Sequence, residues 1–242
     1  MLTEQLRRIG FPCDRISEGY ASFFTPARLA QLAEIAAKIG NAPFFPAAEH
    51  VLRFAEVDPA HLRCVIVGMD PYPSHTVGQN GEIIPEATGR SFEVASVHDW
   101  GAKYRQASLR NMLKSIYYME RGAVPSMEEL REELATGRFP ILPPHAWWDS
   151  LEQQGVLFLN ASLTVLPDHP GTHTALWDSF VTDLMTFIAQ QAPSAVWLLW
   201  GNVAQARVPV AVTNKITASH PRLPQFVTEC PFARVSDIRW LG

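Results

Sequence analysis

Four short apolar runs along the chain each have the length of a strand and end abruptly in a polar residue or a turn. They occupy residues 63–68, 156–159, 196–200 and 215–218. In the segments between them, apolar residues recur every three or four positions, which is the spacing of a helix that packs on one face. Strands that alternate with helices pair in parallel through right-handed crossovers, so that helices cover both faces of the sheet. The pattern predicts an α/β/α sandwich around a four-stranded parallel sheet.

Three helices have clear apolar faces. The first spans residues 26–39 and follows Thr25, whose hydroxyl can cap a helix that begins with proline. The others span 108–119 and 177–190. We expect a single domain over the whole chain, residues 1–242, with residues 1–40 as a helical N-terminal extension.

The remaining segments carry weaker signals. Residues 73–92 contain three glycines and two prolines spread through a polar stretch, which predicts a long loop. Residues 121–146 are rich in proline and glycine, and we expect one short acidic helix among them. Residues 149–154 are expected to lead into the second strand.

Three polar side chains follow these strands. Asp70 comes after the first strand, Asn160 ends the second and His220 follows the fourth. In an open parallel sheet, ligands bind in the crevice beyond the carboxyl ends of the strands. The three side chains are therefore expected to meet there, where they can hold a planar, hydrogen-bonding ring beside a carboxylate.

The composition is that of an ordinary globular protein, with 47% hydrophobic and 18% charged residues among 242. No apolar run approaches the length of a membrane span, and the N-terminus lacks the pattern of a signal peptide. The three cysteines are odd in number and widely spaced, which argues against a disulfide framework and against an iron–sulfur cluster. We expect a cytoplasmic monomer without a cofactor. We also expect no metal site, because Pro170 and Gly171 prevent a helix from presenting His169 and His173 to an ion.

The net charge of −4 does not by itself favour nucleic-acid binding, since phosphate contacts normally require a basic face. Local basic clusters exist and can be either solvated surface charges or contacts to phosphate. They are Arg105, Arg110 and Lys114, and later Lys215 and Arg222.

Five motifs along the chain resemble, in the same order, those of the uracil-DNA glycosylases, and in particular the uracil-N-glycosylase family. They are Gly68–Tyr72, Gly89–Phe92, Gly155–Val165, Leu198–Gln205 and His220–Pro221. The resemblance extends over roughly residues 40–242, and several motifs in order are much harder to obtain by chance than one. It implies the glycosylase fold and an enzyme of base-excision repair that releases uracil from single- or double-stranded DNA.

Cleaving the bond between a base and its sugar builds positive charge on the sugar and negative charge on the departing base. The resemblance gives Asp70 the first task, which is to orient water and stabilise the sugar cation. It gives His220 the second, which is to donate a hydrogen bond to the base carbonyl as a neutral imidazole. Taken alone, an aspartate or a histidine before proline is more often structural, and the ordered motifs reverse that preference.

Four further residues are implied at the base. The amide of Asn160 can bond to N3–H and O4 of uracil, whereas cytosine presents the reverse pattern. Phe92 would stack on the flipped base, and Tyr72 would stand where the methyl group of thymine must go. Met69 is implied beside the same pocket. From residue type alone, Asn160 can instead cap a turn, and both aromatic rings can belong to the core.

DNA contacts are implied for His173, Ser108, Arg222 and Leu223. Here the chain departs from the family pattern, because Pro224 stands where the family has its intercalating leucine. Leu223 or Arg222 can fill that role, and the sequence leaves this choice open.

Three other departures surround the motifs. Pro73 stands where many members have histidine, and the proline-rich loop before the next helix is reduced to residues 106–108. The segment 73–92 is about nine residues longer than the resemblance leads one to expect. We expect part of it, residues 74–90, to take over some of the contact with DNA.

Two alternatives remain open at this stage. One is a glycosylase-like fold that binds DNA as a scaffold with weak catalysis or none, which the acidic balance and altered loops favour. The other is a glycosylase for a different deaminated base, for which Asn160 and Tyr72 would be the determinants.

Overall fold

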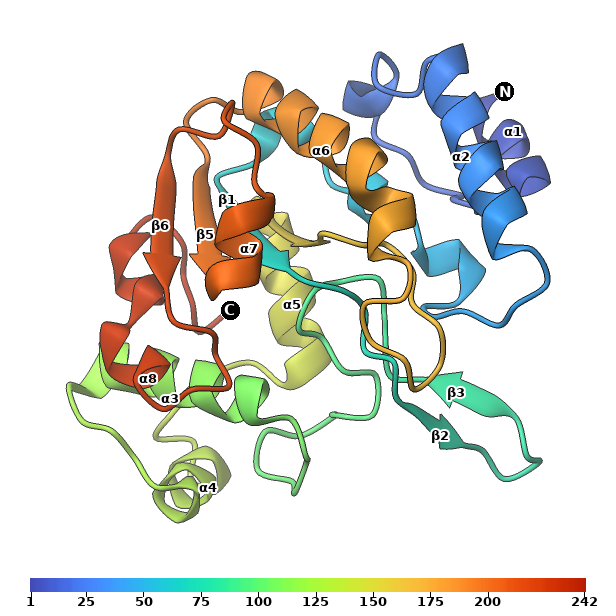
Figure 1. Cartoon of the computed structure of the whole chain (residues 1–242). Coiled ribbons are helices and arrows are strands. Elements are labelled where there is room, and N and C mark those ends of the chain that lie inside the picture. The colour runs from blue at the N-terminus through green and yellow to red at the C-terminus, as the bar shows by residue number, and fades with distance from the viewer.

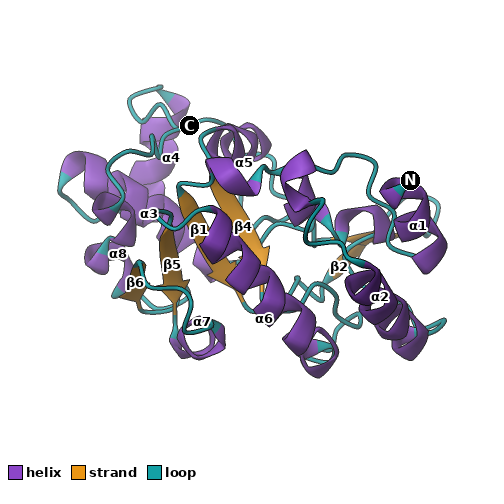
Figure 2. Ribbon diagram, turned by 90° about the horizontal axis from the view of Figure 1, so that it is seen from above, coloured by secondary structure: helices purple, strands orange, loops and turns teal.

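The computed structural model describes residues 1–242 and has a four-stranded parallel sheet between two layers of helices (Figures 1 and 2). The strands lie in the order β4-β1-β5-β6. Their bounds are Cys64–Gly68 for β1, Val156–Asn160 for β4, Val196–Trp200 for β5 and Lys215–Ala218 for β6. The predicted α/β/α sandwich and all four of its strands are confirmed.

The central strand β1 is buried along its whole length, which explains its continuous apolar sequence. Its side chains alternate between the two faces of the sheet. Val65 and Val67 join the core on one side, whereas Cys64 and Ile66 join the core on the other. Burial on both faces fixes the register, because a shift by one residue would exchange the two sets.

The helices divide between these two cores (Figure 2). Those on the Val65 side are α1 (Leu2–Ile9), α2 (Pro26–Ile39), α6 (Thr174–Gln191) and the short α7 (Asn202–Arg207). Those on the Ile66 side are α3 (Ala107–Arg121), α4 (Met127–Ala135), α5 (Pro144–Gln153) and α8 (Phe226–Glu229). None of these helices is both long enough and apolar enough to span a membrane.

The first forty residues are packed into the body of the protein. The side chains of Leu6, Phe11 and Tyr20 are buried in the same core as Val65. Helix α2 begins as the sequence predicts, with the Thr25 hydroxyl accepting a hydrogen bond from the Arg28 N–H at 3.3 Å.

Two elements differ from the sequence prediction. The expected loop 73–92 contains an antiparallel hairpin of β2 (His75–Val77) and β3 (Ile83–Pro85), which extends away from the sheet (Figure 1). Its strands are only three residues long, so they carry too little alternation to be recognised. The segment expected to lead into β4 is instead the buried helix α5, which starts at Pro144 because proline is favoured in a first helical turn.

Candidate active site

The carboxyl ends of the four parallel strands meet at one edge of the sheet, as predicted from the polar residues that follow them. A cleft of about 410 Å³ opens there between the ends of β1, β5 and β6. Its walls include Met69, Phe92, Trp200, His220, Arg222 and Leu223. Asp70 follows Met69 directly, and Asn160 is aligned with Gly68 in the register of β1 and β4.

The Asn160 side chain lies against the end of β1. Gly68 lines the cleft, and a Cβ atom at that position would collide with Asn160 Oδ1 and lie 2.7 Å from Ser91 Cβ. Asn160 is only 3% exposed, its carboxamide forms no hydrogen bond with the protein, and it is not among the side chains whose unpaired polar atoms are fully enclosed. The little surface that Asn160 keeps therefore includes its amide, which is free to form hydrogen bonds with a ligand.

Asp70 is partly buried beside the cleft. Its Oδ2 accepts a hydrogen bond from the Gly171 N–H at 2.5 Å. Burial raises the pKa of Asp70 above its ordinary value, and the Gly171 hydrogen bond acts in the opposite direction. The other carboxylate oxygen accepts no hydrogen bond from the protein and is available to a water molecule or a substrate.

His220 enters the cleft from the loop after β6. Its Nδ1 accepts a hydrogen bond from the Arg222 N–H at 3.1 Å, which places the ring proton on Nε2. Burial lowers the pKa of His220, and the charge of Arg222 lowers it further. Both effects favour the neutral imidazole, whose Nε2–H has no hydrogen-bond partner in the protein.

The His220 loop is attached to two helices. Ser219 bonds through its N–H and hydroxyl to the Glu229 carboxylate at the end of α8, at 2.6 and 2.7 Å. The Asn111 amide on α3 donates to the Pro221 carbonyl at 2.7 Å. These bonds fix the direction in which the imidazole points.

Phe92 forms an aromatic wall of the cleft. Its ring centroid lies 5.3 Å from that of Trp200 and 6.3 Å from that of His220. Its backbone has φ of 64°, an uncommon value for a residue with a side chain. Neighbouring contacts stabilise this conformation, because the Ser91 N–H donates to the Phe158 carbonyl and the Ser91 hydroxyl to the Ile66 carbonyl.

Arg90 stabilises the segment that carries Phe92 through ion pairs. Its guanidinium, 6% exposed, binds Glu152 and Asp149 on α5 and Glu93 on its own segment. The shortest of these contacts are 2.5 and 2.6 Å. Arg90 thus anchors the segment that carries Phe92 to helix α5.

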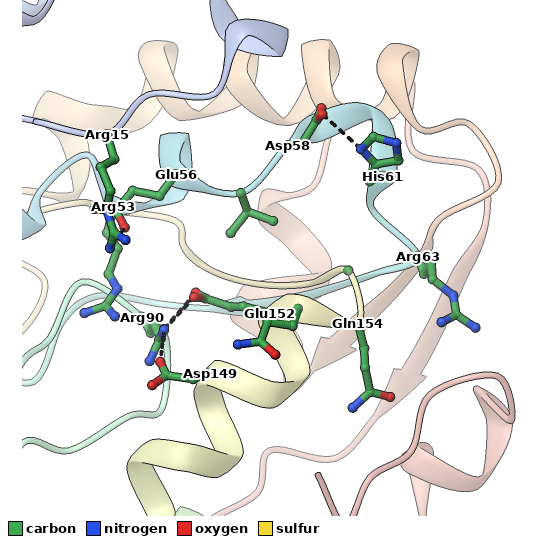
Figure 3. A pocket seen from close by; sticks show the side chains of 13 residues that line it. Arg15, Arg53, Glu56, Asp58, His61, Arg63, Arg90, Asp149, Glu152 and Gln154 are labelled. Atoms are coloured by element: carbon green, nitrogen blue, oxygen red, sulfur yellow. Dashed lines mark hydrogen bonds and ion pairs between the residues drawn. The ribbon is translucent and has the colours of Figure 1, made fainter.

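The largest cavity, about 820 Å³, lies at the opposite edge of the sheet, where residues such as Arg63 and Gly155 precede β1 and β4 (Figure 3). Its charged side chains mostly pair with one another, as Arg15 does with Glu56 and His61 with Asp58. It contains none of the residues predicted for catalysis. We therefore assign the site to the smaller cleft.

The other predicted residues lie in varied surroundings. Tyr72 packs between two apolar clusters and is not among the residues that line the cleft. His173 is only 6% exposed and its Nδ1 lies 2.9 Å from the Thr164 hydroxyl, so it has little surface to offer to DNA. Ser108 lies in the first turn of α3 and is partly exposed. Arg222 and Leu223 are exposed at the cleft, and Leu223 retains 38% of its surface.

Two parts of the site were not predicted from the sequence. The Gly171 N–H that binds Asp70 is a backbone group, and only the turn-forming residues around it could have suggested an ordered loop. Val203, 48% exposed at the cleft, follows a motif glycine at the start of α7 but was assigned no role.

Comparison with known proteins identifies a family for this chain. The family model of the uracil DNA glycosylase superfamily matches residues 54–231. A uracil-DNA glycosylase of Idiomarina loihiensis is 32% identical over 182 residues, covering 73% of this chain and 70% of the relative. One from Chromobacterium violaceum is 34% identical over 180 residues, covering 73% of this chain and 61% of the relative.

Solved structures share the fold. The UNG of Nitratifractor salsuginis superposes with a TM-score of 0.71 at 22% identity, covering 98% of this chain and 96% of that one. Mimivirus uracil-DNA glycosylase superposes with a TM-score of 0.60 at 22% identity, covering 89% and 71%.

The protonation state of His220 can be measured without substrate. In an NMR titration of the ring protons, assigned with His220→Asn, we expect the pKa of His220 to lie below the usual value of about 6.5. Arg222→Gln should raise it, because the variant removes a positive charge and keeps the backbone N–H. Lys38→Gln, at the end of α2, is the matched control. A pKa at or above the usual value would contradict the buried, neutral ring.

Proposed function

Because this chain belongs to the uracil DNA glycosylase superfamily, we propose that it hydrolyses the bond between uracil and deoxyribose in DNA as the first step of base-excision repair. The observation that carries the proposal is the grouping of Asp70, Asn160 and His220 at one edge of the sheet. The Asn160 amide, which has no protein partner and is not fully enclosed, is available to a hydrogen-bonding ring.

In the proposed reaction, Asp70 stabilises the positive charge on the sugar and His220 stabilises the negative charge on the departing base. The free oxygen of the Asp70 carboxylate orients the attacking water and stabilises the positive charge that builds on the sugar. The His220 Nε2–H donates to the uracil carbonyl as negative charge accumulates on the departing base. A neutral donor suits this task because it stabilises the base anion without delivering a proton to it.

Base selection rests on Asn160, Phe92 and Tyr72. Asn160 would bond to N3–H and O4 of uracil, and Phe92 would stack on the flipped ring beside Met69. Tyr72 would exclude the methyl group of thymine. Tyr72 does not line the cleft, so its action would require the base to reach deeper than the cleft described above.

The DNA-facing surface would lie around the mouth of this cleft. Leu223 and Arg222 are exposed there, and Ser108 is a further contact that we propose. His173 would contribute only through the 6% of its surface that is exposed. The β2–β3 hairpin begins shortly after Tyr72 and Pro73. It exposes Val77 and Ile83, which face each other across its two strands. These apolar side chains could fill the space that a flipped base leaves in a duplex.

A DNA-binding scaffold without catalysis is the less favoured alternative. Binding alone does not require a carboxylate, an amide and a neutral imidazole at one strand edge. The monomeric state and the cytoplasmic location remain proposals from composition. Uracil release is the experiment that separates an enzyme from a scaffold, tested on single- and double-stranded oligonucleotides beside hypoxanthine and mismatched thymine.

The proposed charge of Asp70 is tested by Asp70→Asn. We expect the single-turnover rate of uracil release to fall by roughly 10³-fold, because the carboxylate acts on the transition state. The affinity for DNA should stay within about threefold of wild type, as measured by fluorescence anisotropy. Asp14→Asn, an exposed carboxylate in the N-terminal segment, is the control. A rate loss below about tenfold would remove Asp70 from this role.

Base selection is tested with Asn160→Asp and Tyr72→Ala. Asn160→Asp should gain cytosine release, because a carboxylate can accept from the cytosine amino group. Tyr72→Ala should gain thymine release, because it removes steric bulk. Both products are measured by separating the free bases after incubation with duplex DNA. If neither folded variant gains its new activity, these residues do not read the base.

The hairpin is tested by replacing Val77–Ile83 with two glycines, which keeps His75 and its contacts. We expect duplex activity to fall at least about tenfold more than single-strand activity, because only a duplex must be unstacked. Leu223→Ala should have a smaller effect, with Val124→Ala as the control for exposed apolar surface. The reverse ranking, with a duplex-specific loss only in Leu223→Ala, would show that Leu223 is the wedge.

A further inference from the structure

The loop between β4 and α6 holds one oxygen of the Asp70 carboxylate. The hydrogen bond comes from the Gly171 N–H, 101 residues further along the chain, at 2.5 Å. Gly171 has φ of 77°, a conformation that suits glycine and turns its N–H toward the carboxylate. Because Oδ2 is engaged, the orientation of the carboxylate is restricted and Oδ1 has no protein partner.

The side chain that closes this loop is Thr172. Its hydroxyl accepts from the Leu166 N–H at 3.0 Å and donates to the His169 carbonyl at 3.0 Å. The His169 N–H in turn donates to the Leu166 carbonyl at 3.1 Å. One hydroxyl thus joins both ends of the loop at the residue next to Gly171.

The same loop is anchored to the segment that carries Asp70. The Asp168 N–H donates to the Pro73 carbonyl at 2.8 Å, and the Asp168 carboxylate lies 3.9 Å from His75 Nδ1. The loop therefore contacts the chain on the C-terminal side of Asp70 as well as the carboxylate itself. A shift of the loop would displace Gly171 relative to Asp70.

We propose that Thr172 is a positioning residue for Asp70, because its hydroxyl holds the loop in the shape that presents the Gly171 N–H. Thr172 touches neither the reacting bond nor the base, and it acts only through Gly171. The catalytic part of this inference rests on the proposed role of Asp70, whereas the structural part concerns the carboxylate alone.

The direction of the effect follows from the surroundings of Asp70. Burial raises the pKa of Asp70 and the Gly171 N–H lowers it, so loss of that hydrogen bond must raise the pKa further. Titratable side chains on the segments packed against Asp70 are His75, Asp168, His169 and His173, and His220 lines the cleft. No charged side chain is among the causes of this pKa shift, so Thr172 can act on it only through burial or through the Gly171 hydrogen bond. Greater exposure of the carboxylate would lower the pKa, so a raised pKa identifies loss of the hydrogen bond.

The test compares Thr172→Val, which removes the hydroxyl at nearly constant shape, with Thr172→Ser, which keeps it. The pKa of Asp70 is read by NMR of ¹³C-labelled aspartate carboxyls, with the signal assigned by Asp70→Asn. We expect Thr172→Val to raise the pKa by roughly one on the pH scale and Thr172→Ser to leave it unchanged. Thr186→Val, which removes a hydroxyl bonded to the Thr182 carbonyl within α6, is the control. An Asp70 pKa that is the same in all of these proteins overturns the proposal.

Kinetics supply the second measurement. In single turnover, Thr172→Val should lower the rate of uracil release about tenfold and move its acid limb to higher pH, with DNA affinity unchanged. Thr172→Ser should restore both. A rate loss without movement of the acid limb would show that Thr172 supports the loop generally and does not act through Asp70. If the wild-type protein releases no uracil, the proposed function fails, and the carboxyl titration still decides the role of Thr172.

Discussion

The last position of β1 has no room for a side chain, and the geometry of the site depends on this. A Cβ atom at Gly68 would collide with Asn160, which ends β4, and with Ser91, which comes from the segment before α3. Ser91 in turn bonds to carbonyls on both β1 and β4. Three segments distant in sequence are thus brought together at one strand end. Any larger residue at position 68 would push the Asn160 amide and the Phe92 wall apart.

The sheet and its polar edge could be predicted because the signals are local and strong. A run such as Val65–Val67 is apolar at every position only when both faces of the strand are covered. Parallel pairing then places the carboxyl ends of all strands at one edge, so Asp70, Asn160 and His220 could be grouped without knowledge of any contact. The neutral state of His220 could be expected from its task. Its physical cause, which is burial together with Arg222, required the structure.

The elements that were missed depend on contacts or on weak patterns. The hairpin strands are three residues long and expose Val77 and Ile83, so no core-facing alternation marks them. Helix α5 begins at the second of two consecutive prolines, and such a pair favours a loop when the apolar residues that follow, such as Trp147, are few. The Gly171 N–H has no sequence signature at all, because every residue except proline carries one.

Burial acts in opposite senses on the two proposed catalytic groups. It raises the pKa of Asp70, which works against the charged carboxylate, and it lowers the pKa of His220, which favours the neutral ring. The ionised form of Asp70 and the neutral form of His220 exist together only above both pKa values. In a plot of rate against pH, each group therefore lowers the rate on the acid side and neither lowers it on the alkaline side. The protein opposes the effect of burial only at Asp70, where the Gly171 hydrogen bond lowers the pKa. Of the two groups, only Asp70 must remain charged in a partly buried site. The backbone amide opposes the effect of burial without adding a positive side chain beside the sugar, where a cation would oppose the charge that builds there.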